Sequence, residues 1–149
     1  MFSGRFDHAI DDKGRVSIPV RFREVLQRDG HERLYITNFI SEGQHCLELY
    51  PPNEWEKLLE QISHKARFDP QVRTFELFYI GGAHQVLVDR QGRILIPPKL
   101  REFAALGREA TFSANVNRFQ LWDKTVLEQV LKAAEQQFQN PEFFEKLGL

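Results

Sequence analysis

The sequence predicts a mainly β fold with flanking α-helices, in which two copies of one unit interlock into a single pseudo-twofold β-barrel. Three observations predict it. A fourteen-residue motif occurs twice in the 149-residue chain, and short aliphatic strands bounded by Gly, Pro and Asp turns surround each copy. The third observation is the size of the repeated unit. A unit of about 45 residues buries too little apolar surface to be stable alone. We therefore expect the two copies to share one core.

The repeated motif is DDKGRVSIPVRFRE at residues 11–24 and DRQGRILIPPKLRE at residues 89–102. The two segments align without gaps, and seven of the fourteen positions are identical. About one identity would be expected by chance at ordinary residue frequencies. The identical pairs are Asp11/Asp89, Gly14/Gly92, Arg15/Arg93, Ile18/Ile96, Pro19/Pro97, Arg23/Arg101 and Glu24/Glu102.

Each copy begins with a strand, at residues 6–10 and 85–88, followed by a D-x-x-G-R turn. In such a turn the Asp side chain accepts hydrogen bonds from backbone amides further along, and Gly supplies positive φ. A short strand follows, and a proline then starts a short helix, because proline suits the first helical position. A hairpin completes each copy. The turn-forming residues are Asp11, Gly14, Asp89 and Gly92; the short strands are 16–18 and 94–96; the hairpins are 34–38 with 46–50 and 110–114 with 118–122.

An amphipathic helix follows each hairpin, because apolar residues recur at helical spacing over 55–66 and over 127–138. Asn53 with Glu56 predicts a capping box for the first helix. Asp123 predicts a side-chain cap for the second.

A third helix is predicted over 70–80, starting after Asp69 and ending at Gly81-Gly82. Its sequence VRTFELFYI is apolar nearly all round, so we expect it to be buried between elements or between subunits. With Phe138, Phe143 and Phe144, it predicts a homo-oligomer. The predicted organisation is repeat 1 at 5–52, a helical connector at 53–80, repeat 2 at 81–124, and a C-terminal helix and tail at 125–149.

Composition favours a soluble, cytoplasmic protein with no membrane partner. Hydrophobic residues make up 42% of the chain and charged residues 28%, which are ordinary globular values. No apolar run reaches the roughly 18 residues that a membrane span needs. The N-terminal MFSGRFDHAIDD carries charges where a signal peptide needs apolar residues. A single cysteine excludes an intramolecular disulfide framework.

The net charge of −1 hides two basic islands. Residues 13–28 hold five basic residues against Glu24, a local +4, and residues 90–101 hold four basic residues and no acid, again +4. The islands coincide with the repeated motif, which is the pattern of a nucleic-acid-binding surface.

Arg15 and Arg93 follow the turn glycines, where a guanidinium group can reach a phosphate or a guanine edge. The alternative is a salt bridge to Asp11 or Asp89 that only staples the turn. The duplication and the surrounding cations favour DNA contact. We predict principal contacts from Lys13, Arg15 and Arg93, and phosphate contacts from Arg5, Arg21, Arg23, Arg90, Lys99 and Arg101, some of which must face inward or pair with Glu24 and Glu102.

The sequence gives little support for catalysis. Asp11 and Asp89 are better explained as turn formers than as an acid–base pair. Cys46 lies in a strand between apolar neighbours and is predicted to be a small core residue. The five histidines form no metal-binding pattern, and no P-loop, G-x-S-x-G or G-x-G-x-x-G motif occurs. We predict no enzymatic activity, no metal and no cofactor.

Four segments, MFSGRF at the start, DDKGRVSIP at 11–19, LYPPNEW at 49–55 and DRQGRILIP at 89–97, resemble the MraZ family of bacterial transcription regulators. The resemblance implies two AbrB-like swapped-hairpin repeats in one chain, a ring-shaped homo-oligomer, and binding to short direct repeats of double-stranded DNA upstream of the division and cell-wall gene cluster. It places DNA contacts at Asp11, Lys13, Arg15, Asp89 and Arg93. Gln91 stands where the first copy has Lys13, so unequal contacts by the two turns are expected.

The residues thus predict a sequence-specific DNA-binding transcription regulator, and the resemblance implies that it is nucleoid-associated and represses this cluster, including its own promoter. One alternative is an antitoxin-like protein-binding module of the same barrel class, which would need a disordered acidic arm. The other is an enzyme on a double-psi-like barrel, which would need a reactive constellation of side chains.

Overall fold

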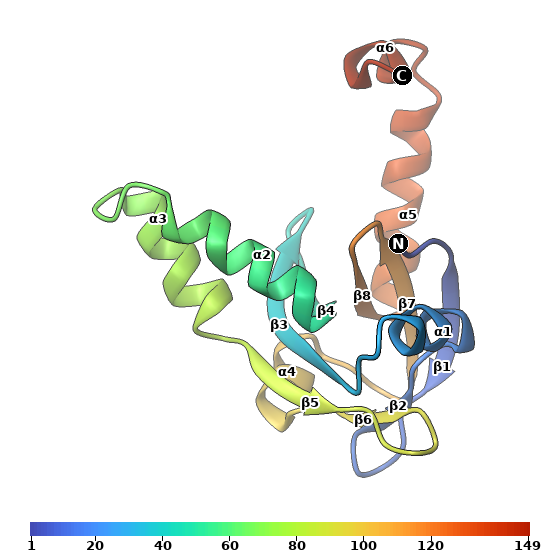
Figure 1. Ribbon diagram of the computed structural model, residues 1–149. Helices are drawn as coiled ribbons and strands as arrows, with labels where there is room; N and C mark the ends of the chain where they lie inside the picture. The colour runs from blue at the N-terminus through green and yellow to red at the C-terminus, as the bar shows by residue number, and fades with distance from the viewer.

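The computed structural model describes residues 1–149 as a β core from which helices project (Figure 1). All the predicted strands and hairpins are present. The strands are β1 (Arg5–Ala9), β2 (Arg15–Ser17), β3 (Arg33–Ser41), β4 (Gln44–Tyr50), β5 (His84–Leu87), β6 (Arg93–Leu95), β7 (Glu109–Asn115) and β8 (Arg118–Asp123). The helices are α1 (Val20–Arg28), α2 (Pro52–Ser63), α3 (Pro70–Phe75), the π-helical η1 (Glu76–Ile80), α4 (Pro98–Phe103), α5 (Lys124–Phe138) and α6 (Glu142–Leu147).

The two repeats exchange strands. Six strands form one antiparallel sheet in the order β1-β7-β8-β4-β3-β5. Strand β1 of the first repeat pairs with β7 of the second, and β5 of the second repeat pairs with β3 of the first. Each repeat therefore completes the hairpin of the other, and neither copy has a separate sheet.

A pseudo-twofold axis relates the repeats. The strand order reads the same from either end once β1, β7 and β8 are exchanged for β5, β3 and β4. Equivalent residues meet at two places: Val16 lies opposite Ile94 between β2 and β6, and Glu48 lies opposite Gln120 between β4 and β8. The axis passes through both pairs.

The predicted barrel is wrong, because the sheet does not close. Strands β1 and β5 are its free edges, and β2 and β6 form a separate two-stranded ribbon. The ribbon strands have three residues each and run into Pro19 and Pro97, which lack the amide proton that a longer ladder would need. The short strands pair only with each other and cannot bridge the two edges.

One apolar core fills the space between the sheet, the ribbon and the short helices. It includes Ile18 and Ile96, which directly follow the ribbon strands, and both are fully buried. Phe22 of α1 lies with its ring centroid 4.8 Å from that of Phe119 of β8, so the short helix of one repeat packs on the hairpin of the other. Burial of these side chains anchors the base of each D-x-x-G-R turn.

A buried polar cluster lies at the axis. Glu48 of β4 accepts hydrogen bonds from Arg118 Nε at 3.2 Å and Gln120 Nε2 at 2.7 Å, and from the Tyr79 hydroxyl. Burial, followed by the nearby Glu48 charge, raises the pKa of the Tyr79 hydroxyl. The cluster joins η1 to hairpins from both repeats. No feature of the local sequence around Glu48 predicted it.

The helix predicted over 70–80 forms, but with a change of pitch. Asp69 caps it by accepting a hydrogen bond from the Gln71 amide at 2.8 Å, and α3 then passes into η1 at Glu76. Its expected burial is only partial within one chain: Tyr79 is buried, whereas Leu77 is 83% exposed. One face of the helix contacts the sheet, so the opposite face lies in solvent.

The two amphipathic helices pack on apolar clusters through their N-terminal halves, with Leu58 of α2 and Val130 and Leu131 of α5 partly buried. Trp55 of α2 and Leu127 of α5 are buried, whereas Leu59 and Phe138 further along are exposed. The Asp123 cap of α5 forms, with Val126 as donor at 3.1 Å. The capping box predicted at Asn53 is wrong, because the N-cap of α2 is Pro51, two residues earlier, and makes no side-chain cap.

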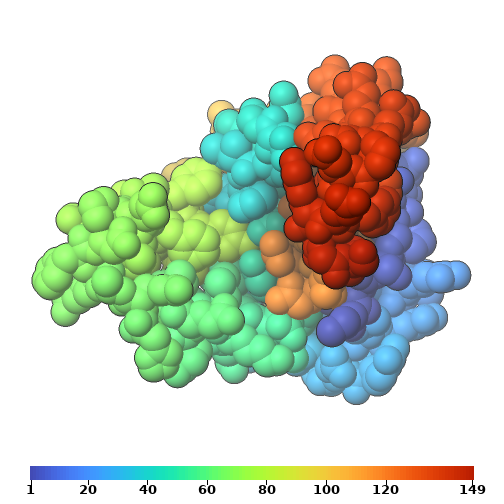
Figure 2. Space-filling model, turned by 90° about the horizontal axis from the view of Figure 1, so that it is seen from above, coloured from blue at the N-terminus to red at the C-terminus, as the bar shows by residue number.

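The helices give the molecule two separate projections. In Figure 1, α2 and α3 extend to one side of the sheet, while α5 and α6 extend upward. Figure 2, seen from above, shows the α2–α3 projection in green and the C-terminal segment in red on different parts of the surface. No helix has both the length and the apolar composition needed to cross a membrane.

Candidate nucleic-acid interface

The first turn is organised by Asp11. Its Oδ1 accepts hydrogen bonds from the Lys13 amide at 3.0 Å and the Arg15 amide at 2.8 Å. The Gly14 amide donates to the Asp11 carbonyl at 3.0 Å, and Gly14 has a φ of 88°, which a side chain would oppose. Asp and Gly therefore act in this turn as the sequence predicted.

The second turn repeats this geometry. Oδ1 of Asp89 accepts from the Gln91 and Arg93 amides, both at 2.9 Å, and Gly92 has a φ of 78°. Because the two sequences share only Asp, Gly and Arg within the turn, these three residues are sufficient to account for its shape. The two positions between Asp and Gly can therefore hold different side chains: Asp12 and Lys13 in the first turn, and Arg90 and Gln91 in the second.

The same carboxylates hold the two turn arginines. Arg15 Nε lies 2.8 Å from Oδ2 of Asp11, and Arg93 Nε lies 3.2 Å from Oδ2 of Asp89. The staple that the sequence offered as an alternative to DNA contact is therefore present. It occupies only Nε, however, and leaves both terminal nitrogens of each guanidinium group without a protein partner. The two side chains are 37% and 31% exposed, so the free ends reach solvent.

The carboxylates stay ionised over a wide pH range. Hydrogen bonds from the Arg15 amide and then from its side chain lower the pKa of Asp11 to about 2. The Arg93 amide has the same effect in the second turn and lowers the pKa of Asp89. Both carboxylates are therefore available as charged acceptors for the arginines at physiological pH.

Each turn is covered by an arginine from the other repeat. A Cβ atom added to Gly92 would lie 2.3 Å from Nη1 of Arg23, and one added to Gly14 would lie 3.3 Å from Nη1 of Arg101. Arg23 also donates from Nε to the Ile18 carbonyl at 3.0 Å. Both arginines are half-buried, so each has a structural role beneath the opposite turn.

The ribbon fixes the two turns relative to each other. The Ile18 amide donates to the Gly92 carbonyl at 2.8 Å, and the Ile96 amide donates to the Gly14 carbonyl at 2.9 Å. Each turn is thereby bonded to the end of the other repeat's strand. Both turns lie at the end of the molecule opposite α5 and α6 (Figure 1).

The other predicted cations differ in exposure. Arg5, Lys13, Arg21, Arg90 and Lys99 are exposed, in contrast to the half-buried Arg23 and Arg101. The ion pairs expected for Glu24 and Glu102 are absent, since both carboxylates are exposed and neither forms a salt bridge. Their charges remain in solvent next to the two islands.

Two further cations lie near the turns and were not predicted, because strand pairing rather than local sequence brings them there. The Arg108 carbonyl accepts a hydrogen bond from the Ile10 amide at 2.8 Å, which places Arg108 beside the first turn. Arg33 lies opposite Leu87, two residues before the second turn. Both are exposed. Recognising the β1–β7 and β3–β5 exchange would have been the only route to them.

The remaining chemical candidates lie elsewhere. Cys46 is buried against Trp122 and Leu127, and burial raises the pKa of its thiol, so it is a core residue as predicted. No group of three or more His, Cys, Asp or Glu side chains is placed to hold a metal ion.

A family model described as "MraZ protein, putative antitoxin-like" matches residues 1–78 and again residues 79–144. The two matches together span nearly the whole chain. The chain belongs to the MraZ family. The match divides the MraZ chain within η1, between residues 78 and 79, so that each half holds one D-x-x-G-R turn and one hairpin.

Several relatives are named "Transcriptional regulator MraZ". The relative from Thermomicrobium roseum is 44% identical over 122 residues, covering 82% of this chain and 81% of its own. The relative from Syntrophobacter fumaroxidans is 38% identical over 149 residues, covering 99% and 97%. The relative from Shewanella woodyi is 36% identical over 149 residues, covering 100% and 97%. These three relatives carry the name of a transcription regulator, and each matches at least 82% of this chain.

Proposed function

We propose that this protein is a sequence-specific DNA-binding transcription regulator and that the two D-x-x-G-R turns are its principal DNA contacts. The proposal rests on how the guanidinium groups of Arg15 and Arg93 are held. Each guanidinium group is held through Nε by its turn aspartate, while its terminal nitrogens point to no protein group. An arginine held in this way loses little conformational freedom on binding, which favours affinity and selectivity.

Phosphate contacts would come from the exposed cations around the turns. Lys13 of the first turn and Arg90 of the second are exposed on the same loops as the principal arginines. Arg5, Arg21, Lys99, Arg33 and Arg108 are exposed on the adjoining elements. Arg23 and Arg101, which pack on the turn glycines, would support the turns and contribute their charge. Contacts of this kind set orientation on the duplex and carry no sequence information.

The two turns would read different bases. The first carries Asp12 and Lys13 between its shared residues, and the second carries Arg90 and Gln91. The short DNA site that one chain reads, here called a box, would then be asymmetric. This fits the short direct repeats upstream of the division and cell-wall genes that the family resemblance implies. We propose repression at that site, including the protein's own promoter, by a ring-shaped homo-oligomer in the nucleoid.

A gel-shift assay tests the proposal with Arg15→Ala. On promoter DNA that carries the direct repeats, loss of a bidentate contact should cost about 1–3 kcal/mol per site. The matched control is Lys57→Ala, which removes the same charge from an exposed position on α2, away from both turns. Binding of the Arg15 variant to the promoter as tightly as the control binds would remove the turns from the interface.

The antitoxin-like alternative has less support in this structure. It requires a disordered acidic arm that wraps a partner, whereas residues 124–138 form an ordered helix with no net charge: Lys124 and Lys132 balance Glu128 and Glu135. If the wild-type protein binds no DNA in the gel-shift assay, the alternative becomes the better explanation.

A further inference from the structure

Two apolar surfaces stay uncovered in the single chain. The first is a pocket between the sheet and the α3–η1 helix, here called the arm pocket. The second is a cluster of three phenylalanines where α5 meets α6, here called the tail knot. Large exposed apolar patches on a folded chain mark interaction sites.

The arm pocket is open and has a volume of about 700 Å³. Phe39 and Ile40 of β3 form one wall, and Phe75 and Phe78 form the other. No charged side chain lines it; Pro70, Gln71, Thr74 and Tyr79 complete the lining. Its shape and chemistry fit one or two aromatic side chains.

The tail knot has the complementary form. The ring centroid of Phe138 lies 5.0 Å from those of both Phe143 and Phe144. Phe138 is 56% exposed and Phe144 is 43% exposed. Three aromatic rings at the tip of a projecting helix form a protrusion without a partner.

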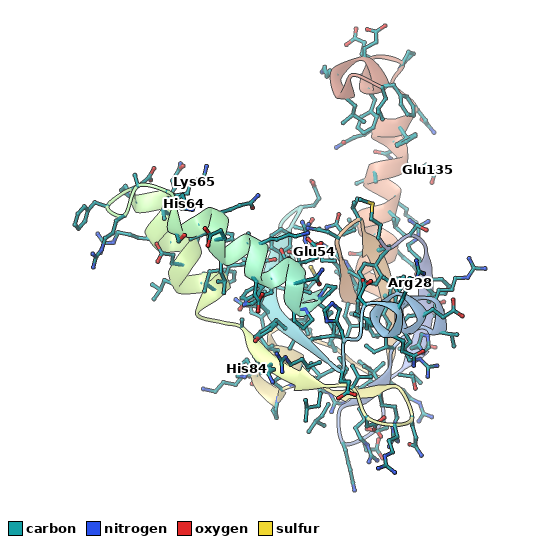
Figure 3. All side chains as sticks on the ribbon, viewed as in Figure 1. Arg28, Glu54, His64, Lys65, His84 and Glu135 are labelled. Carbon is teal, nitrogen blue, oxygen red and sulfur yellow. The ribbon has the colours of Figure 1, made fainter.

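The arm pocket and the tail knot of one chain lie on different projections. Figure 3 shows His64 and Lys65 at the far end of α2 and Glu135 near the far end of α5, pointing away from each other. Figures 1 and 2 separate the two projections in both views. A 15-residue helix that starts in the sheet at Asp123 cannot fold back onto the arm. The partner must be another molecule.

The charges around the two surfaces favour a second copy of this chain. Residues 64–77 hold three basic residues (Lys65, Arg67, Arg73) and two acidic residues (Asp69, Glu76), a net +1. Residues 132–149 hold two basic residues (Lys132, Lys146) and three acidic residues (Glu135, Glu142, Glu145), a net −1. Opposite signs around matching apolar centres favour association of the two surfaces.

We propose that the tail knot of one copy docks into the arm pocket of the next. The inference rests on the homo-oligomer of the proposed function, and it names the surfaces that would form that oligomer. Because the two surfaces differ, the contact is heterologous and repeats head to tail. It uses neither D-x-x-G-R turn, so every turn stays available in the assembly.

Two single variants test the direction of the contact. Thr74→Glu places a charge in the arm pocket and leaves the tail knot intact. Phe144→Glu does the reverse. Both positions are exposed, so both variants should keep the wild-type circular dichroism spectrum and melting temperature. Light scattering at micromolar concentration should give the mass of one chain for each variant. Leu87→Glu, at an exposed position on β5 outside both surfaces, should assemble as the wild type does.

Mixing the two variants gives the decisive result. The intact tail knot of the Thr74 variant can dock into the intact arm pocket of the Phe144 variant, so the mixture should form a dimer and nothing larger. A twofold-symmetric interface would leave the mixture monomeric, and that result would overturn the proposal. So would assembly of either variant alone to the wild-type mass.

Disulfide cross-linking gives a second readout that does not depend on disrupting the interface. Thr74→Cys and Phe144→Cys proteins should cross-link under oxidation when mixed and not when kept separate; Cys46 is buried and stays unreactive. Cross-linking of either protein with itself would overturn the head-to-tail contact. Failure of the DNA-binding proposal is seen separately, because Arg15→Ala should abolish specific binding and still assemble.

Discussion

At the scale of the residue, one carboxylate performs two tasks in each turn. Oδ1 of Asp11 closes the backbone, and Oδ2 of the same group aims Arg15. The sequence alone left a salt bridge to Asp11 and DNA contact by Arg15 as competing explanations. They are compatible because a carboxylate has two oxygens and a guanidinium group has more donors than one oxygen can accept.

The pH dependence of the first turn follows from the lowered pKa of Asp11. The folded-state value of about 2 lies below the ordinary value of 3.8, so the ionised turn stabilises the fold above 3.8 and this contribution is lost as the pH falls through about 2. We expect an NMR titration to show the Asp11 carboxyl protonating near pH 2, with the Arg15 amide shift moving in parallel. Protonation near pH 4 with an unchanged Arg15 signal would mean that the turn does not hold the arginine.

The two turn glycines should differ in their tolerance of alanine. Both have positive φ, which costs a non-glycine residue about 1 kcal/mol or more. At Gly92 the new methyl group would also overlap Arg23, at 2.3 Å, whereas at Gly14 the closest atom of Arg101 is 3.3 Å away. Urea unfolding should therefore show a larger loss for Gly92→Ala than for Gly14→Ala. The same loss at both positions would show that Arg23 moves aside freely.

At the scale of the element, local pattern predicted the turns and the short helices well. Asp, Gly and Pro act through bonds within a few residues, so their effects can be read from the motif alone. The contact of Arg23 with Gly92 could not be predicted this way, because it joins residues from different repeats. Arg33 and Arg108 could not be singled out from the other surface cations either, because pairing between strands of different repeats places them near the turns. The sequence predicted the strands but not that the sheet stays open. Closure depends on the length of β2 and β6, which have three residues each and pair only with each other.

The Glu48 cluster gives a prediction for the β4–β8 pair. Glu48→Ala would leave Arg118 and Tyr79 buried or half-buried without their acceptor. Removing one partner of a buried ion pair costs about 3–5 kcal/mol, and we expect a loss of that size in denaturant unfolding. Glu48→Gln keeps an acceptor and should lose less. A loss below about 1 kcal/mol for Glu48→Ala would show that the cluster contributes little to pairing of the repeats.

At the scale of the whole molecule, multivalent binding should impose a spacing on the DNA. An assembly holds its turns in fixed register, and a second box then binds intramolecularly, which can raise avidity ~10²–10⁴-fold. Boxes should therefore recur at about 10–10.5 bp, one helical turn.

Two promoter variants test this spacing. Inserting 5 bp between neighbouring boxes should weaken the gel-shift complex far more than inserting a full turn, because only the half-turn insertion rotates one box to the far side of the duplex. Equal losses for the two insertions would mean that each chain binds independently.

The pairing of Glu48 with Gln120 on the pseudo-twofold axis has a consequence for how such a fold can change over time. In a dimer of identical short chains, any residue on the axis meets its own copy. A glutamate there would face another glutamate, and two carboxylates in one buried site cannot both stay ionised. Joining both units in one polypeptide removes that constraint, because each half can mutate without the other. A fused chain can thus carry a single charge on its own axis and use it to bind Tyr79 of the linking helix, an arrangement that a dimer of identical units could not reach.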